Sequence, residues 1–363
     1  VNFRDSEFDY ARWLHLHGFD AETFIYYRNW KKASVDLSFL NIVDRTLIEL
    51  KRAKQQWLQT YMRTGLSGQT AAVAIAMTLG DKQHISEEVK DDYSISGASH
   101  VLALSGLHLS IIYAIFLFGF NLCKGIPYIS TLVRYHLSDL LVLLLIWLYA
   151  LLVDFSPSVV RSATMITVYS MVGLLNRDKF SLNTLALTAI ILLAARPQNL
   201  WDVGFQMSFM AMLVIVLFAP LLYGLLSRER LQHHWLLRWV WGPATVSVAA
   251  QTGTAPLVAY YFGRFSCYFL LSSFVVIPCA TIVLYAAILL LACFSVPTVQ
   301  FIVGKTLLTV VGFMNTALHR IAHLPGASIE ALHPSVLQVS LCFAFLFCMY
   351  YSATFINNET NLR

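Results

Sequence analysis

Polar side chains interrupt the apolar stretches of this sequence in four short segments. The first, residues 96–108, carries His100 and His108 together with Ser105 and Gly106. An uninterrupted helix places the two histidines on one face, about 12 Å apart along its axis. One metal ion does not bridge that distance, so the spacing favours the lining of a pathway over a metal site. The alternative is a pair of histidines that hydrogen-bond between packed helices.

Arg161 is the charged residue of the second segment, residues 156–162. Pro157 suits the first turn of a helix, which places Arg161 several residues inside an apolar stretch. A guanidinium that faces a water-filled pore binds phosphate groups well. The alternative is a side chain that extends along the helix surface to the membrane interface.

The third segment, residues 199–209, combines a carboxylate with uncharged polar groups. Asp202 fits the N-cap position of the helix that follows it. Gln206 and Ser208 lie deeper in the apolar stretch, where polar side chains are costly and tend to mark a functional path. Asn183, on the preceding apolar stretch, is predicted to hydrogen-bond to them.

The fourth segment, residues 250–256, contains Gln251, Gly253 and Pro256 within an apolar run. Glycine and proline at these positions predict a broken helix. The backbone groups freed by such a break must face protein or water.

The composition requires these residues to be positioned by membrane helices. Hydrophobic residues make up 58% of the chain and charged residues 12%, with a mean hydropathy of +0.64. Soluble domains carry roughly a quarter charged residues. The six cysteines form no C-x-x-C pair and read as small buried hydrophobes, so neither a metal site nor a cofactor is predicted.

The sequence predicts an all-α fold, a polytopic transmembrane helical bundle of eight or nine spans with re-entrant or broken helices. Residues 1–92 hold 25 of the 45 charged side chains, which marks a boundary before a membrane domain at 93–356. Within 41–92 we expect a basic amphipathic helix (41–64), either at the membrane interface or as a soluble surface helix, and a short re-entrant or partly buried helix (68–80). The predicted spans lie near 97–122, 135–153, 157–176, 181–196, 204–226, 240–262, 269–295, 299–322 and 335–355.

Several motifs, in their order along the chain, resemble the ComEC competence-protein family. Each is weak alone, but the combination is specific and covers roughly residues 70–330. Residues 1–40 resemble the tail of the OB-like domain that precedes the membrane domain in this family. The motifs are AMTLGD (76–81), SGASHVLALSGLHLS (96–110), PSVVRSA (157–163), NTLALTAIILLAARPQNLWDVGFQMSF (183–209) and AQTGTAPLVAYYFG (250–263).

The resemblance implies a multi-pass channel in the cytoplasmic (inner) membrane that takes up single-stranded DNA during natural transformation. The implied partners are single-stranded DNA, membrane lipid and other DNA-uptake proteins, and no catalytic residue is implied because transport needs no nucleophile. Pore-lining or gating roles fall to His100, Ser105, His108, Arg161, Asn183, Gln206, Ser208 and Gln251. Turn or structural roles fall to Asp81, Gly106, Gly204 and Pro256.

The sequence departs from the family pattern in two respects. Ser273 stands where the family usually has an asparagine. The H-x-H-x-D-H motif of the family's metallo-β-lactamase-like domain does not occur, and the chain does not begin with Met. We therefore expect a channel module of a longer protein, without nuclease activity of its own.

Three alternatives remain open at this point. One is a small-solute transporter, and another is a non-functional remnant that has lost its flanking domains. The third is an intramembrane serine protease of rhomboid type, with Ser105 as nucleophile and His323 as base. That reading requires the two side chains to lie within hydrogen-bond reach.

Overall fold

The computed structural model divides into two compact units, Val1–Arg52 and Ala53–Arg363. The positions described between Arg45 and Gln55 are helical, as the sequence predicts for that stretch. The rest of the predicted helix over 41–64 and almost all of the predicted OB-like segment lie outside the described residues. The structure describes single positions between 14 and 55, and then residues 68–122, 137–174, 182–292 and 296–361.

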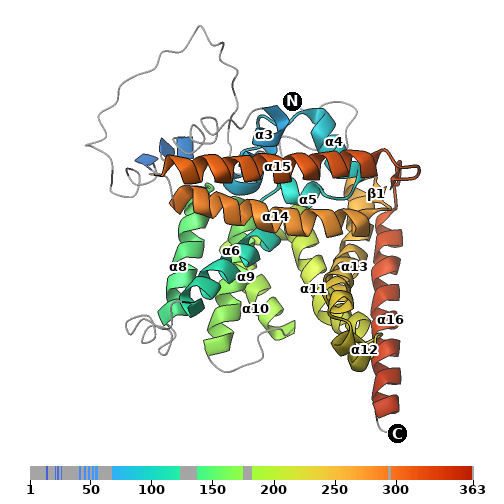
Figure 1. Ribbon diagram of the computed structural model, residues 1–363. Helices are drawn as coiled ribbons and strands as arrows, with labels where there is room; N and C mark the ends of the chain where they lie inside the picture. Colours follow the sequence, from blue (N-terminus) through green and yellow to red (C-terminus); the bar gives the residue numbers. More distant parts are fainter. Residues whose placement is uncertain are drawn as a thin grey trace. The chain divides into compact units, whose positions relative to one another are not determined.

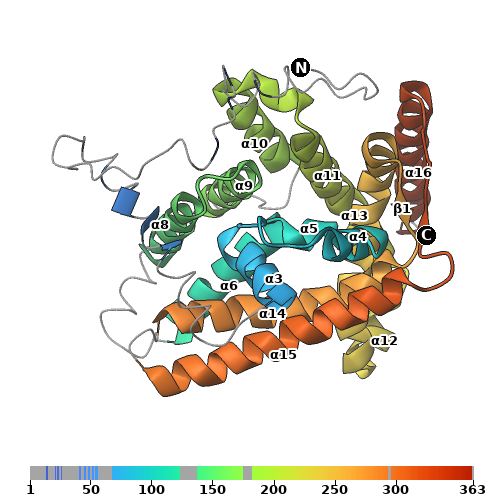
Figure 2. The same ribbon diagram turned by 90° about the horizontal axis from the view of Figure 1, so that it is seen from above.

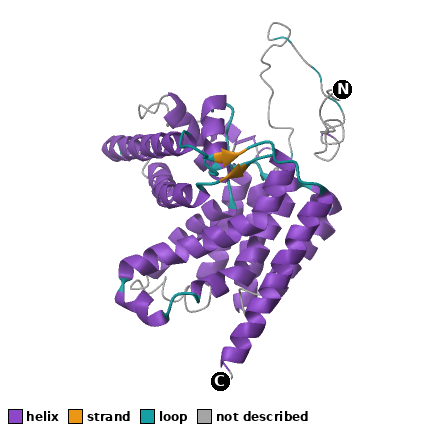
Figure 3. Cartoon of the chain, turned by 90° about the vertical axis from the view of Figure 1, so that its right-hand side faces the viewer, coloured by secondary structure: helices purple, strands orange, loops and turns teal. Residues whose placement is uncertain are grey.

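Helices form nearly all of the described part of the second unit, which confirms the predicted all-α class (Figure 1). The strands described there are one short antiparallel pair, β1 (Phe265–Ser266) and β2 (Ser328–Ile329) (Figure 3). The helices are α3 (Gly68–Leu79), α4 (Glu87–Ile95), α5 (Ser99–Leu102), α6 (Gly106–Leu122), α8 (Leu137–Leu152), α9 (Pro157–Leu174), α10 (Leu182–Ala195), the 3-10 helix η4 (Pro197–Trp201), α11 (Val203–Tyr223), α12 (Arg228–His233), α13 (Trp235–Phe262), α14 (Phe269–Ala292), α15 (Pro297–Ala322) and α16 (Val336–Asn361).

Four of the described helices are long and apolar enough to cross a bilayer. The chain is therefore a multi-pass membrane protein. Helices α6, α8 and α10 are apolar but shorter than the roughly 20 residues that a crossing needs. Helices α14 and α15 lie side by side and run crosswise to α8 and α16 (Figures 1 and 2), so these four helices do not share one axis. The four candidate spans are Val203–Tyr223, Phe269–Leu290, Thr298–Ala322 and Val336–Phe355.

Helix α3 lies in the core of the second unit, packed against α5, α14 and α15. Every residue from 71 to 79 is buried, and most are alanine or other apolar residues. The buried Thr78 donates its hydroxyl to the Ala74 carbonyl at 2.7 Å, which satisfies the polar group within the helix. The short helix predicted over residues 68–80 is thus present and enclosed by protein.

Helix α4 connects this core to α15 through a buried phenol. Ser86 caps the helix by accepting a hydrogen bond from the Val89 amide. Tyr93 donates from its hydroxyl to Asn315 Oδ1 at 2.6 Å. Burial, reinforced by Cys279 and Asp92, raises the pKa of the Tyr93 hydroxyl well above its usual range.

Helices α11 and α13 form the most extensive helix pair in the described fold, and Gly253 lies at their contact. A Cβ atom at Gly253 would lie 2.8 Å from the Met210 carbonyl oxygen and 2.8 Å from Val214 Cγ2. Small residues allow membrane helices to approach this closely. Gly253 therefore sets the spacing of the pair.

The predicted break in the fourth segment is wrong, because α13 runs as one helix through Gly253 and Pro256. Membrane helices tolerate proline where the surrounding structure accommodates the carbonyl that it frees. Pro256 frees the Thr252 carbonyl, and the next residue, Gly253, lies at the contact of α13 with α11. The helix therefore continues across the proline within its contact with α11.

The Gly253 contact predicts a stability cost for a single added methyl group. Gly253→Ala should lower the free energy of unfolding by about 1–3 kcal/mol, the range typical of overpacking, because α11 and α13 must separate. Thermal unfolding in detergent, followed by circular dichroism, measures the change. Gly312→Ala is the matched control, since a Cβ atom there has no neighbour within 4 Å. Equal stability of the two variants would contradict the contact.

Candidate functional site

The first polar segment contains the interruption in helical structure that the fourth segment lacks. Helix α5 ends at Leu102 and α6 begins at Gly106, with the intervening residues outside any helix. His100 and His108 therefore do not lie on one face of a single helix, and that prediction is wrong. His100 is exposed on α5, whereas His108 is fully buried in α6.

Ser105 and His108 are hydrogen-bonded to each other at the N-terminus of α6. His108 Nδ1 accepts a hydrogen bond from the Ser105 amide at 3.2 Å and lies 2.8 Å from Ser105 Oγ. This arrangement resembles a capping box, in which the third helical residue accepts from the N-cap amide. Because the amide can only donate, the proton of the neutral imidazole lies on Nε2. That buried nitrogen has no hydrogen-bond partner among the described residues.

The start of α6 is in contact with the second segment, on α9. A Cβ atom at Gly106 would lie 3.2 Å from Ser162 Oγ, so a glycine here allows the two helices to approach closely. Ser162 in turn donates to the Ser158 carbonyl at 2.9 Å. This contact brings the start of α6, with Ser105 and His108, beside α9, the helix that carries Arg161.

Arg161 pairs with Asp202 at the start of α11. Its Nη1 lies 2.8 Å from Asp202 Oδ2, and the Arg161 side chain is 9% exposed against 37% for Asp202. Asp202 Oδ1 also accepts from the Gly204 amide at 3.1 Å, which confirms the predicted N-cap of α11. One carboxylate thus starts α11 and neutralises the arginine of α9. Arg161 Nε is buried without a partner among the described residues.

Gly204 provides the space for the guanidinium. A Cβ atom at this position would lie 2.7 Å from Arg161 Nη2, closer than real atoms approach. The structural role predicted for Gly204 is therefore the accommodation of Arg161.

Gln206 extends the polar groups from α11 to α13. Its Nε2 donates to the Leu200 carbonyl at 2.9 Å, and its Oε1 accepts from the Tyr261 hydroxyl at 2.7 Å. Gln206 is half-buried, and Tyr261 is exposed. The structure thus connects the first three segments with each other, and Tyr261 adds the C-terminal part of α13 beyond the fourth segment. We call this set of groups the polar chain: Ser105, His108, Ser162, Arg161, Asp202, Gln206 and Tyr261.

Other predicted site residues lie away from these contacts. Asn183 is exposed in the first turn of α10, about 18 Å along that helix from its junction with η4. The predicted hydrogen bonds from Asn183 do not form, since Gln206 is bonded to Leu200 and Tyr261. Ser208 and Gln251 are half-buried on α11 and α13.

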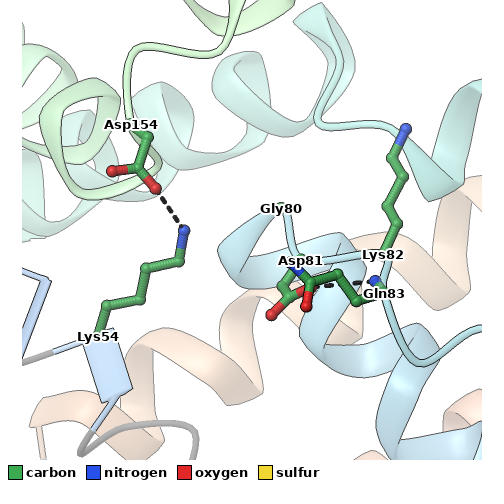
Figure 4. Close-up of a pocket in the computed structure, with 6 residues that line it drawn as sticks. All are labelled: Lys54, Gly80, Asp81, Lys82, Gln83 and Asp154. Atoms are coloured by element: carbon green, nitrogen blue, oxygen red, sulfur yellow. Dashed lines mark hydrogen bonds and ion pairs between the residues drawn. The ribbon is translucent and has the colours of Figure 1, made fainter. Parts of the chain in front are cut away.

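Asp81 forms the turn that the sequence predicts. Its Oδ1 accepts from the Gln83 amide at 3.0 Å, directly after Gly80, whose φ of 75° ends α3. Figure 4 shows this turn at the edge of an open cleft of about 490 Å³, where Lys54 reaches Asp154 at 2.9 Å. Two lysines and two aspartates line the cleft together with Gly80 and Gln83, so its formal charge is balanced.

Comparison with known proteins agrees with the motif pattern. The family model described as "Competence protein" matches residues 77–355, and the chain belongs to this family. It is 30% identical over 200 residues to ComE operon protein 3 of Bacillus subtilis (strain 168), a match that covers 54% of this chain and 23% of that protein. An uncharacterized protein of Aquifex aeolicus (strain VF5) is 28% identical over 192 residues, covering 52% of this chain and 40% of the relative.

The chain thus matches less than half the length of each of these relatives. The resemblance inferred from the motifs is confirmed at the level of the family. No solved structure matches the chain.

Sequence reasoning missed three contributors to these contacts. Ser162 and Tyr261 lie within the quoted motifs but are common as packing residues, and their partners are distant in the sequence. Asp202 was identified only as a helix cap. The signal that could have revealed its second role is Arg161 itself, because a buried arginine needs an anionic partner.

The ion pair predicts different costs for two neutralised carboxylates. Asp202→Asn keeps the N-cap oxygen but leaves Arg161 buried without its counter-charge. We expect a loss of about 2 kcal/mol, below the roughly 3–5 kcal/mol of a fully buried pair because Asp202 is partly solvated. Glu87→Gln, in the surface pair with Lys90, should leave the thermal unfolding midpoint in detergent unchanged. Equal midpoints for both variants would contradict a buried charge interaction.

Proposed function

We propose that this chain is the membrane channel module through which single-stranded DNA enters a cell during natural competence. Membership of the competence protein family and the four helices able to cross a bilayer support this function. The polar chain supplies the chemistry, since it joins α6, α9, α11 and α13 through groups that suit a polyanion.

The observation that carries the proposal is a pair of buried donors in the polar chain. His108 Nε2 and Arg161 Nε have no hydrogen-bond acceptor among the described residues. An unsatisfied buried donor costs about 1–3 kcal/mol, and more when it is charged. Both donors suit the oxygen atoms of a phosphate group. They lie on α6 and α9, which contact each other through Gly106 and Ser162.

The Arg161–Asp202 pair would act as an exchangeable latch between α9 and α11. A phosphate can replace a carboxylate as the acceptor of a guanidinium, because both present paired oxygens to its planar donor fork. Asp202 is accessible enough for such an exchange, with 37% of its side chain exposed. A strand that takes over Arg161 would release α11, and the pair would re-form after the phosphate has passed. Contacts of this kind bind a moving strand without trapping it.

A catalytic role is not part of this proposal. Ser105 is hydrogen-bonded to His108 at the start of α6, and His323 is bonded to the His319 carbonyl on α15. The Ser105–His323 pairing required by the protease alternative is therefore absent from the described structure. The chain would bind lipid along its apolar helices and act with other DNA-uptake proteins.

Transformation by a naturally competent host tests the proposal. Arg161→Ala should lower the number of transformants at least about tenfold while DNA binding at the cell surface and the amount of protein in the membrane stay unchanged. Arg161→Lys should retain part of the activity, since it keeps the charge but not the planar fork. Internalised labelled DNA, measured after nuclease treatment of the cells, gives the uptake directly.

Arg238→Ala is the matched control, because Arg238 is exposed on α13 and outside the polar chain. Asp202→Asn keeps Arg161 but removes its counter-charge, so its DNA uptake, compared at equal amounts of protein in the membrane, reports on the latch. Wild-type uptake by Arg161→Ala would refute the proposed contact with phosphate. Flux of a small solute that is lost in this variant, with DNA uptake intact, would favour the transporter alternative.

A further inference from the structure

Asp92, His319 and His323 form a compact cluster at the contact of α4 with α15. His319 Nδ1 lies 2.9 Å from Asp92 Oδ2, and His323 Nδ1 lies 3.9 Å from Asp92 Oδ1. The two imidazole centroids are 4.2 Å apart. One nitrogen or oxygen atom from each residue lies within 4.8 Å of the others, which is the spacing of atoms that bind one metal ion.

The cluster is held in place before any ligand binds. His319 in the last turn of α15 and His323, its C-cap residue, are one helical turn apart, the spacing of the two histidines in helical zinc motifs. One turn earlier on α15, Asn315 accepts the hydrogen bond of Tyr93, the neighbour of Asp92. Asp92 is largely buried, with 12% of its side chain exposed, so its carboxylate is fixed at the contact.

The hydrogen bonds of His323 orient its ring as metal ligands are oriented. Its Nδ1 lies 2.8 Å from the His319 carbonyl oxygen, to which it donates when it carries the ring proton. In that tautomer Nε2 is free to accept a metal ion, and a backbone carbonyl is a common partner for the other nitrogen of a ligating histidine. The side chains of His319 and His323 are 48% and 64% exposed, so an ion can reach them from solvent.

An ion pair between Asp92 and His319 does not by itself account for the position of His323 in the cluster. His323 places a second imidazole against the first, with its Nδ1 3.9 Å from Asp92 Oδ1. Two nitrogen donors and one oxygen donor suit Zn²⁺ and related transition ions rather than Ca²⁺ or Mg²⁺, which prefer oxygen.

We propose that Asp92, His319 and His323 bind one divalent transition-metal ion, of which Zn²⁺ is the best match. Three protein ligands leave a fourth position for water, which agrees with the exposure of the histidines. The ion would fasten α4 to the end of α15. The site is separate from the polar chain, so it does not depend on the proposed channel function.

Zinc titration of the full chain tests the site. Protein purified in detergent without a polyhistidine tag and treated with a chelator is titrated with Zn²⁺ by calorimetry. We expect one equivalent to bind and the midpoint of thermal unfolding to rise with zinc concentration, since an ion that binds only the folded state stabilises it. Co²⁺ should give the visible absorption bands of a four-coordinate site.

Matched variants identify the ligands. His319→Ala with His323→Ala should abolish binding, and Asp92→Asn should weaken it at least about tenfold. His84→Ala removes another exposed histidine and should bind zinc as the wild type does. The double variant decides the matter even if Asp92→Asn fails to fold, because both histidines are exposed. Wild-type protein that binds no zinc, or a double variant that binds it normally, would overturn the proposal.

Discussion

The ion pair between Arg161 and Asp202 is the constraint on which the arrangement of the polar groups depends. A guanidinium within an apolar bundle requires an anionic partner, because an unpaired buried charge costs several kcal/mol. Asp202 meets this need from the start of α11, where its second oxygen also caps the helix. The positions of α9 and α11 are therefore coupled, since moving either helix would break the pair or uncap α11.

Glycines at the helix contacts make this coupling possible. Gly106, Gly204 and Gly253 lie against Ser162, Arg161 and the Met210–Val214 turn respectively, and a side chain at any of them would meet its neighbour. None of the three adopts the left-handed backbone conformation that favours glycine. These residues therefore serve close packing rather than chain reversal. The side chains of the polar chain come close together because the helix backbones approach one another at these glycines.

The sequence predicted features that depend on local chemistry, and it failed where distant packing decides. The enclosed α3 helix, the Asp202 cap and the Asp81 turn follow from composition and from hydrogen bonds within a few residues. The continuity through Pro256 runs against the local propensity of proline, in a helix that packs along α11. The break before Gly106 was also missed, although the hydrogen bonds of Ser105 with His108 that accompany it are local. The cluster of Asp92 with His319 joins positions 227 residues apart, and no spacing rule detects such a pair.

The enclosure of α3 has a consequence for how the protein is made. The helix is covered by α14 and α15, and α15 begins more than 200 residues after α3 ends. At synthesis rates of about 5–20 residues per second, α3 leaves the ribosome roughly 10–45 s before its cover exists. A 12-residue helix is too short to span the bilayer, so it must wait at the membrane surface or within the insertion machinery. Helix α3 is thus synthesised before the helices that cover it, yet is among the last of the described helices to reach its final place.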